Sequence, residues 1–221
     1  MNSPVKTQGI PTKEEWRRTL AERQGEELLK KLEKAVVAVC GLGGLGSNIA
    51  IALARAGVGR LILLDFDKVD ISNLHRQQYK AFQVGCYKTE ALAENLKEIS
   101  PYTEVKYYTG KVTEKNCREL LREADIICEA FDAAEEKAML VNAVLELFPE
   151  KYLVAASGMA GLGPANTIRT RQVTEKFCLC GDGVSDVADG MGLVASRVML
   201  CAAHQAHAVL RILAGEKKLE E

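Results

Sequence analysis

A glycine-rich turn between an apolar run and a helical pattern limits the folds open to this chain. Residues 36–40 read Val-Val-Ala-Val-Cys, and Gly41, Gly43 and Gly46 follow in a Gly-x-Gly-x-x-Gly spacing before an apolar helical pattern at 47–56. In this context the first glycine permits a tight turn, the second lets phosphates approach the backbone, and the third lets helix and strand pack closely. The free N–H groups that begin the helix attract an anion. The pattern therefore predicts a nucleotide-binding strand–turn–helix unit.

Asp65 ends the next apolar run, Arg60–Asp65, about 20 residues beyond the last glycine, where an acidic residue can hydrogen-bond a ribose hydroxyl. A glycine turn that binds no ligand is the alternative interpretation. The acidic residue at this spacing argues against it. A nicotinamide dinucleotide and a nucleoside triphosphate both remain open at this point.

Strand and helix patterns alternate along most of the chain. Short apolar runs at 35–40, 60–65, 105–109, 125–130 and 152–156 alternate with helical patterns at 47–56, 88–99, 114–122 and 135–148. This order predicts right-handed βαβ units and a Rossmann-like, three-layer α/β fold with a mainly parallel sheet. The alternating segment 166–173 predicts a late antiparallel strand in a mixed sheet, 176–190 a loop, and 191–214 a final helix.

Polar and cationic side chains gather after Asp65: Asp67, Asn73, Arg76, Gln77 and Lys88. For a single Arg or Lys, a solvated surface charge is the simpler interpretation. Behind a ribose-binding acid they are better interpreted together, because cleavage between the α and β phosphates builds negative charge that Arg and Lys can offset. A nicotinamide-dependent oxidoreductase would leave these cations without a role. The cluster favours ATP.

Four ordered motifs carry a family resemblance: Gly41-Leu-Gly-Gly-Leu-Gly46, Asp65-Phe-Asp67-Lys-Val69, Ser72-Asn-Leu-His-Arg76-Gln77 and Gly85-x-x-Lys88. From about Arg23 to Gly215 the chain resembles the ubiquitin-activating-enzyme-like adenylyltransferases, in their ThiF/MoeB branch, and most closely the short ThiF type. The resemblance implies ATP-dependent adenylation of the C-terminal glycine carboxylate of a small ubiquitin-like sulfur carrier with a Gly-Gly tail. It implies the thiamine pathway, release of pyrophosphate, and two regions, a helical arm at 1–33 and one ATP-binding domain at 34–221.

The same resemblance implies roles for individual residues. Asp65 would hold the ribose and Asp132 a magnesium ion, although Ala133 stands where the family usually has Asn. Nucleotide contacts would come from Gly41, Gly43, Gly44, Gly46, Asp67, Asn73, Arg76, Gln77 and Lys88. Among these, Arg76 and Lys88 would act with Asp132 in catalysis. Lys137 falls where the family often has a basic residue, and a surface lysine is an equal alternative.

The family also supplies an arginine from the partner subunit, which makes a homodimer the working unit. Arg23 is the best candidate, with Arg17 and Arg18 as alternatives. An ordinary surface ion pair is a serious competing interpretation for any one of the three.

The cysteines argue against both a disulfide framework and a structural zinc. There are seven, an odd number, scattered over predicted strands and helices, which is typical of reduced thiols. Zinc-binding relatives carry two Cys-x-x-Cys pairs, whereas this chain has only Cys178-Leu-Cys180 in the corresponding region. Cys180 is also the only nearby candidate for the covalent link to the carrier that some relatives form, and an ordinary thiol is the favoured interpretation.

Composition excludes other classes of protein. The net charge is −1 and no basic patch is evident, so neither nucleic acid nor a membrane is the expected partner. No apolar leader occurs at 1–18, and the apolar stretch at 191–213 contains Arg197 and Arg211, so we expect a cytoplasmic protein. Four alternatives remain: a molybdopterin- or cysteine-pathway carrier, a tRNA-linked carboxylate, an NAD-dependent oxidoreductase, and a non-catalytic carrier-binding protein.

Overall fold

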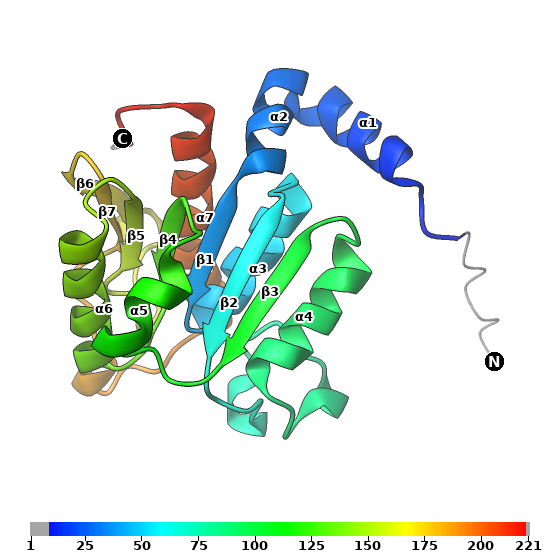
Figure 1. The fold of residues 1–221 in the computed structure, drawn as a ribbon. Coiled ribbons are helices and arrows are strands. Elements are labelled where there is room, and N and C mark those ends of the chain that lie inside the picture. Colours follow the sequence, from blue (N-terminus) through cyan, green and yellow to red (C-terminus); the bar gives the residue numbers. More distant parts are fainter. Residues whose placement is uncertain (1–8, 220–221) are drawn as a thin grey trace.

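The computed structural model describes residues 9–219 and is built around one sheet of seven strands in the order β3-β2-β1-β4-β5-β7-β6 (Figure 1). The strands are β1 Val36–Cys40, β2 Arg60–Asp65, β3 Glu104–Thr109, β4 Ile126–Glu129, β5 Tyr152–Ala156, β6 Arg169–Thr174 and β7 Phe177–Gly181. Every pairing is parallel except that of β6 with β7. The Rossmann-like fold and its mixed, mainly parallel sheet are confirmed.

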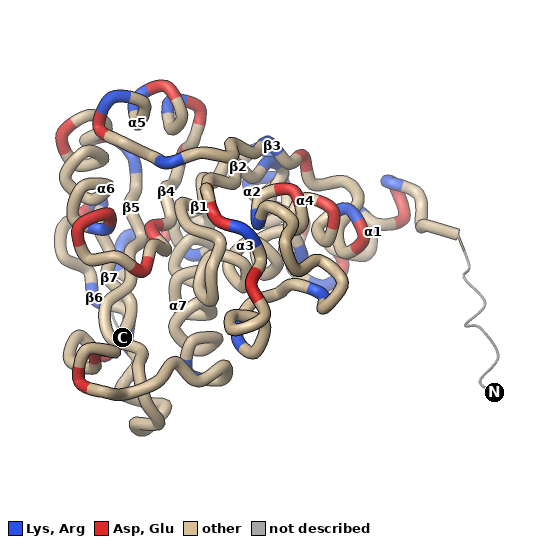
Figure 2. Tube along the Cα trace, turned by 90° about the horizontal axis from the view of Figure 1, so that it is seen from below, with Lys and Arg blue, Asp and Glu red and all other residues tan. Residues whose placement is uncertain are grey.

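The helices are α1 Lys13–Gln24, α2 Glu26–Lys34, α3 Gly44–Ala56, α4 Lys88–Ile99, α5 Glu114–Leu121, α6 Ala134–Leu147 and α7 Ala195–Ala214. None of the helices within residues 9–219 is long and apolar enough to cross a membrane. In Figure 2 the Lys and Arg positions are interleaved with Asp and Glu positions rather than gathered over one element.

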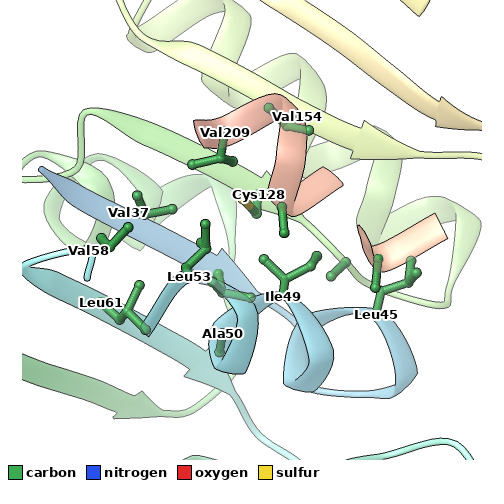
Figure 3. Close-up of a cluster of buried hydrophobic side chains, with 14 of the residues drawn as sticks. Val37, Leu45, Ile49, Ala50, Leu53, Val58, Leu61, Cys128, Val154 and Val209 are labelled. Carbon is green, nitrogen blue, oxygen red and sulfur yellow. The ribbon is translucent and has the colours of Figure 1, made fainter. Parts of the chain in front are cut away.

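Two apolar clusters cover the two faces of the sheet. On one face α3 packs on β1 and α7 packs on β5, β6 and β7, with Ile49, Leu53 and Val209 of the two helices fully buried (Figure 3). On the other face α5 and α6 pack through Leu121 and Leu140. Strands with both faces covered must be apolar throughout, which is why β1 and β5 are almost continuous apolar runs rather than alternating ones.

The strand order reverses between β1 and β4, because the chain moves to β2 and β3 on one side and to β5 on the other. In open parallel sheets, ligands bind in the crevice outside the carboxyl ends of the strands at such a reversal. The glycine turn follows β1 at this end.

The predicted loop at 176–190 is wrong for Phe177–Gly181, which forms β7. This strand inserts between β5 and β6, with Val154 beside Cys178 in parallel register. The apolar run of β7 is short and flanked by Lys176 and Asp182. The many Gly and Asp residues at 181–190 therefore made the whole segment resemble a loop. The last helix also begins at Ala195 rather than at 191, since Gly192 lies in an extended segment whose carbonyl accepts the N–H of Gly161.

Helices α1 and α2 precede β1 and lie where the predicted arm was placed, although its first eight residues fall outside the described range. The two helices meet at Gly25, whose φ of 93° strongly favours glycine. No residue of α1 is buried, and this helix lies at the amino ends of the strands (Figure 1), where Nε2 of Gln24 donates to the Ala56 carbonyl at 3.1 Å. Trp16 contacts Tyr102 edge-to-face at 6.3 Å.

Candidate nucleotide site

A cavity of 660 Å³ opens at the carboxyl ends of β1, β2, β4 and β5. Most of the predicted site residues line it: Gly41, Gly43, Gly44, Asp65, Asp67, Asn73, Arg76, Gln77, Lys88 and Asp132. Three predicted residues have other positions. Gly46 lies in the first turn of α3, Arg23 on α1 and Cys180 within β7.

The glycine turn brings β1 and α3 into close contact. Gly41 has a φ of 90°, and a Cβ there would lie 2.6 Å from the Ala130 carbonyl oxygen. A Cβ on Gly46 would lie 1.8 Å from the carbonyl oxygen of Gly41. Gly43 is different, because the nearest atom to a Cβ is 3.7 Å away, on Gln77. Gly43 caps α3 and has no side chain to accept hydrogen bonds from the first turn of that helix. The N–H groups of this turn are therefore available to an anion.

Asp65 ties the glycine turn to the end of β2. Its Oδ2 accepts the N–H of Leu42 at 2.6 Å, and its Oδ1 accepts the N–H of Asp67 at 2.7 Å. The residue is only 6% exposed. Burial raises the pKa of Asp65, while the charge of Lys88 and the two N–H donors act in the opposite direction. Each carboxylate oxygen keeps a lone pair for a ribose hydroxyl.

Lys88 begins α4 and is buried at the cavity wall. Its Nζ donates to Oδ2 of Asp67 at 2.7 Å, and its own N–H donates to the Asp67 carbonyl at 2.9 Å. The partner carboxylate is half exposed, so the ammonium is paired but remains at the cavity surface. An ammonium has three donors, which leaves capacity for phosphate oxygens.

Arg76 is positioned by its neighbours. Its Nη2 donates to Oδ1 of Asn73 at 2.9 Å. Asn48, on α3, donates to the carbonyls of Gly44 at 2.6 Å and Arg76 at 3.3 Å, and so fixes the glycine turn relative to the arginine. The sequence analysis missed Asn48, although a polar residue within an apolar helical run is the signal that could have identified it.

Gln77 carries a polar atom that the fold leaves unsatisfied. The residue is buried, lines the cavity, and its Oε1 has no hydrogen-bond partner among residues 9–219. Buried acceptors are nearly always paired, so this one fits a donor from a bound ligand.

The carboxyl end of β4 holds a buried ion pair that the sequence analysis did not identify. Glu129 is fully buried, and Nζ of Lys137 donates to its two oxygens at 3.1 and 2.9 Å and to the Phe131 carbonyl at 2.9 Å. Burial raises the pKa of Glu129, and Lys137 opposes that shift. Lys137 lines the cavity, but the three donors of its ammonium are used within the fold. Asp132, one residue beyond Phe131, is exposed and lines the cavity.

Cys180 does not have the surroundings of a nucleophile. Its side chain is fully buried in β7, and burial raises its pKa to about 12. A reactive cysteine needs an accessible thiolate, so its burial and raised pKa argue against the covalent role. Cys86 is exposed and the other cysteines are buried. Residues 9–219 contain no cluster of three or more His, Cys, Asp or Glu that could hold a metal ion.

Arg23 is exposed in the last turn of α1. That helix lies at the amino ends of the strands, whereas the cavity lies at their carboxyl ends (Figure 1). Of the alternatives, Arg17 is paired with Glu26 at 2.6 Å and Glu33 at 3.1 Å in its own chain. Arg23 is thus separated from the cavity of its own subunit.

The profile of the ThiF family matches residues 16–221. The chain belongs to the ThiF family. Among its members, the adenylyltransferase and sulfurtransferase UBA4 of Lodderomyces elongisporus is 34% identical over 145 residues, covering 65% of this chain and 31% of that protein. The sulfur carrier protein adenylyltransferase of Thermus thermophilus is 34% identical over 139 residues, covering 62% of this chain and 46% of that protein.

This ThiF-family chain thus spans about a third to a half of the length of these curated relatives. Among solved structures it resembles the E. coli tRNA N6-threonylcarbamoyladenosine dehydratase TcdA in complex with AMP, with a TM-score of 0.83 and 22% identity, covering 94% of this chain and 98% of that one. The same enzyme in complex with ATP gives a TM-score of 0.78. At this identity the likeness shows a shared fold.

Proposed function

We propose that this protein uses ATP to adenylate the C-terminal carboxylate of a small ubiquitin-like sulfur carrier and releases pyrophosphate. One observation carries the proposal: a single cavity brings together the glycine turn, the buried Asp65, the cations Arg76 and Lys88, and Asp132. The names of the relatives, which include a sulfur carrier protein adenylyltransferase, support the same chemistry.

Each group would have a physical role. Asp65 would accept hydrogen bonds from the ribose hydroxyls, and Oε1 of Gln77 would accept one from the ligand. The first turn of α3, with Arg76 and Lys88, would hold the phosphates. A carboxylate oxygen of the carrier would bond to the α-phosphorus as the bond to the bridging oxygen breaks, and pyrophosphate would leave with that electron pair. Arg76 and Lys88 would offset its charge, and catalysis would come from positioning and electrostatics.

Asp132 suits a magnesium ion, because Mg²⁺ in nucleotide sites is commonly held by one or two carboxylates together with phosphate oxygens. The exposed carboxylate of Asp132 at the cavity edge supplies such a ligand. When bound there, the ion would neutralise charge on the phosphates.

The identity of the carrier is a finer proposal. We propose a thiamine-pathway carrier with a Gly-Gly tail, a homodimer in which Arg23 reaches the partner's cavity, a helical arm at 1–33 with one ATP-binding domain at 34–221, and a cytoplasmic location. A molybdopterin- or cysteine-pathway carrier is the first alternative. A tRNA-linked carboxylate is the second, since the structurally similar TcdA is a tRNA N6-threonylcarbamoyladenosine dehydratase. The interleaved charges in Figure 2 weigh against it.

The test is ATP–pyrophosphate exchange with purified carriers from the three pathways and with tRNA as a separate arm. We expect magnesium-dependent exchange with the thiamine-pathway carrier, and none when its last two glycines are removed. Exchange with another carrier alone would reassign the pathway. If no carrier supports exchange while ATP still binds, the adenylation proposal is wrong.

A further inference from the structure

A second buried cation lies beside the cavity and has no part in the nucleotide contacts described above. Arg197, in the first turn of α7, is only 4% exposed. Its Nε donates to the carbonyl of Ala160 at 3.1 Å, and its Nη1 donates to the carbonyls of Gly163 at 2.8 Å and Pro164 at 3.1 Å. Three contacts of this guanidinium therefore hold the backbone that follows β5.

The remaining contacts of Arg197 reach a different segment. Its Nη2 donates to Oδ2 of Asp182 at 2.6 Å and to Oγ1 of Thr167 at 3.1 Å. The other carboxylate oxygen of Asp182 accepts the N–H groups of Val184 and Ser185, both at 2.9 Å. Burial acts to raise the pKa of Asp182, but these donors and the guanidinium outweigh it and hold that pKa well below its usual range.

Arg197 and Asp182 together join two loops, 157–164 after β5 and 182–194 after β7. The loops also contact each other directly: the N–H of Asp182 donates to the carbonyl of Gly158 at 2.9 Å, and the N–H of Ala160 donates to Oγ of Ser185 at 3.0 Å. A Cβ on Gly158 would lie 2.0 Å from Oδ1 of Asp182, so the approach depends on glycine.

These two loops form one wall of the cavity, through Ser157, Gly158, Met159, Ala160 and residues 183–187. These residues have small or apolar side chains, except for the acid Asp186. None of them is a cation that could hold a phosphate. The wall adjoins the phosphate end, because a Cβ on Gly44 would lie 2.8 Å from Cγ1 of Val198, the residue after Arg197. Such a wall suits a narrow, uncharged peptide segment.

We propose that Arg197 is a positioning residue that sets the passage by which the acyl substrate reaches the α-phosphate. By holding Asp182 and both loops in one arrangement, it controls the approach of the substrate tail rather than the binding of nucleotide. This inference rests on the proposed adenylation. Lysine cannot replace arginine here, because one ammonium has three donors and no planar fork, whereas the guanidinium uses its five donors on five acceptors.

The experiment compares the full-length protein with Arg197→Lys and with Arg211→Lys as a matched control. Arg211 lies on the same helix and also makes several hydrogen bonds, to Glu216, Lys218 and Leu219, but at the far end from the cavity. Four quantities are measured: amide hydrogen exchange by mass spectrometry, the dissociation constant of ATP, and kcat and KM in pyrophosphate exchange with the carrier that supports it. Asp182→Asn is the second variant if Arg197→Lys does not fold.

For Arg197→Lys we expect faster amide exchange in 157–164 and 182–194 with no change in 36–56. We expect KM for the carrier to rise about 10-fold or more, with kcat and the ATP dissociation constant within about 2-fold of wild type. Arg211→Lys should leave all of these values unchanged.

Unchanged amide exchange in both loops would show that Arg197 does not hold them in place, whatever the activity of the variant. Faster loop exchange with an unchanged carrier KM, or an equal loss of ATP affinity, would overturn the assigned role in substrate approach. If wild-type protein supports no exchange with any carrier, the adenylation proposal fails and the role in acyl-substrate approach fails with it. Amide exchange still decides separately whether Arg197 holds the loops.

Discussion

At the scale of single residues, two lysines near the cavity differ in what their partners allow. Lys88 is paired with Asp67, whose carboxylate is half exposed, so solvent or a phosphate can compete for the ammonium. Lys137 is held by the fully buried Glu129 and by a backbone carbonyl. Lys88 ends the last nucleotide motif and Lys137 lies on the helix after Asp132, yet only Lys88 has a partner carboxylate that is exposed to solvent. We therefore assign Lys137 to the stability of the fold.

The assignment predicts that Lys137→Ala lowers the free energy of unfolding by about 3 kcal/mol, because it leaves a buried carboxylate without its partner. Chemical denaturation measures the loss. The double variant Glu129→Gln/Lys137→Met should recover part of it, since no unpaired charge remains.

Lys111→Ala is the control, because it breaks an ion pair to Glu136 on the same helix in which the lysine side chain is 60% exposed. Its cost should stay below about 1 kcal/mol. Equal losses in Lys137→Ala and Lys111→Ala would contradict the assignment.

At the scale of elements, the glycines between β1 and the start of α3 have different roles, some in packing and one in binding. Gly46 faces the backbone of Gly41, and a methyl group there has no room. Gly43 faces the cavity, and a methyl group there meets only the end of the Gln77 side chain. The same Gly-x-Gly-x-x-Gly pattern thus contains two glycines required by the fold, Gly41 and Gly46, and one, Gly43, that leaves space at the cavity.

We expect Gly46→Ala to destabilise the protein by at least about 2 kcal/mol, since α3 must move away from β1. Gly43→Ala should change the unfolding free energy by less than about 1 kcal/mol but weaken ATP binding about 10-fold or more, because the methyl group occupies the phosphate approach. Thermal unfolding and calorimetric titration with ATP measure the two effects. Gly192→Ala, which meets no atom within 4 Å, is the control. A Gly43→Ala protein with wild-type ATP affinity would contradict this placement of the phosphates.

The elements also show what the sequence could predict. Strands β2 and β5 and helix α4 have the predicted bounds, because short apolar runs and a helical apolar period are local signals. Strand β7 was missed because its place depends on pairing with β5, which no local pattern records. The motifs and the family resemblance predicted part of the cavity lining, including Asp65, Arg76 and Asp132. They could not predict the Glu129–Lys137 pair or the five contacts of Arg197, because these join segments distant in sequence.

At the scale of the whole molecule, the arm and the cavity lie at opposite ends of the sheet (Figure 1). A residue of α1 that acts in catalysis must therefore reach the cavity of another copy. In a two-fold dimer each subunit would give its arm to the other, and both cavities would be completed at once. The exposed Arg23, in the last turn of α1, is the residue this arrangement would use.

Mixing two inactive variants tests this arrangement. Arg23→Ala and Asp132→Ala should each lose pyrophosphate exchange as homodimers. After unfolding and refolding together in equal amounts, half of the dimers would be mixed, and each of these would hold one complete cavity. We expect recovery of about a quarter of wild-type activity. No recovery, with mixed dimers verified by differential tags, would show that Arg23 does not act across subunits.

Because Cys86 is the exposed cysteine, a fluorescent dye can be attached to the protein at a single natural position. Cys86 is exposed, the other cysteines are buried, and Cys86 lies two residues before Lys88 in the segment that also contacts Val69. A maleimide dye would attach at this one natural position without any engineered cysteine, because alkylation needs an accessible thiolate. Its emission would report on the segment that carries Lys88 when nucleotide enters, and would give the kinetics of ligand entry from an unmutated chain.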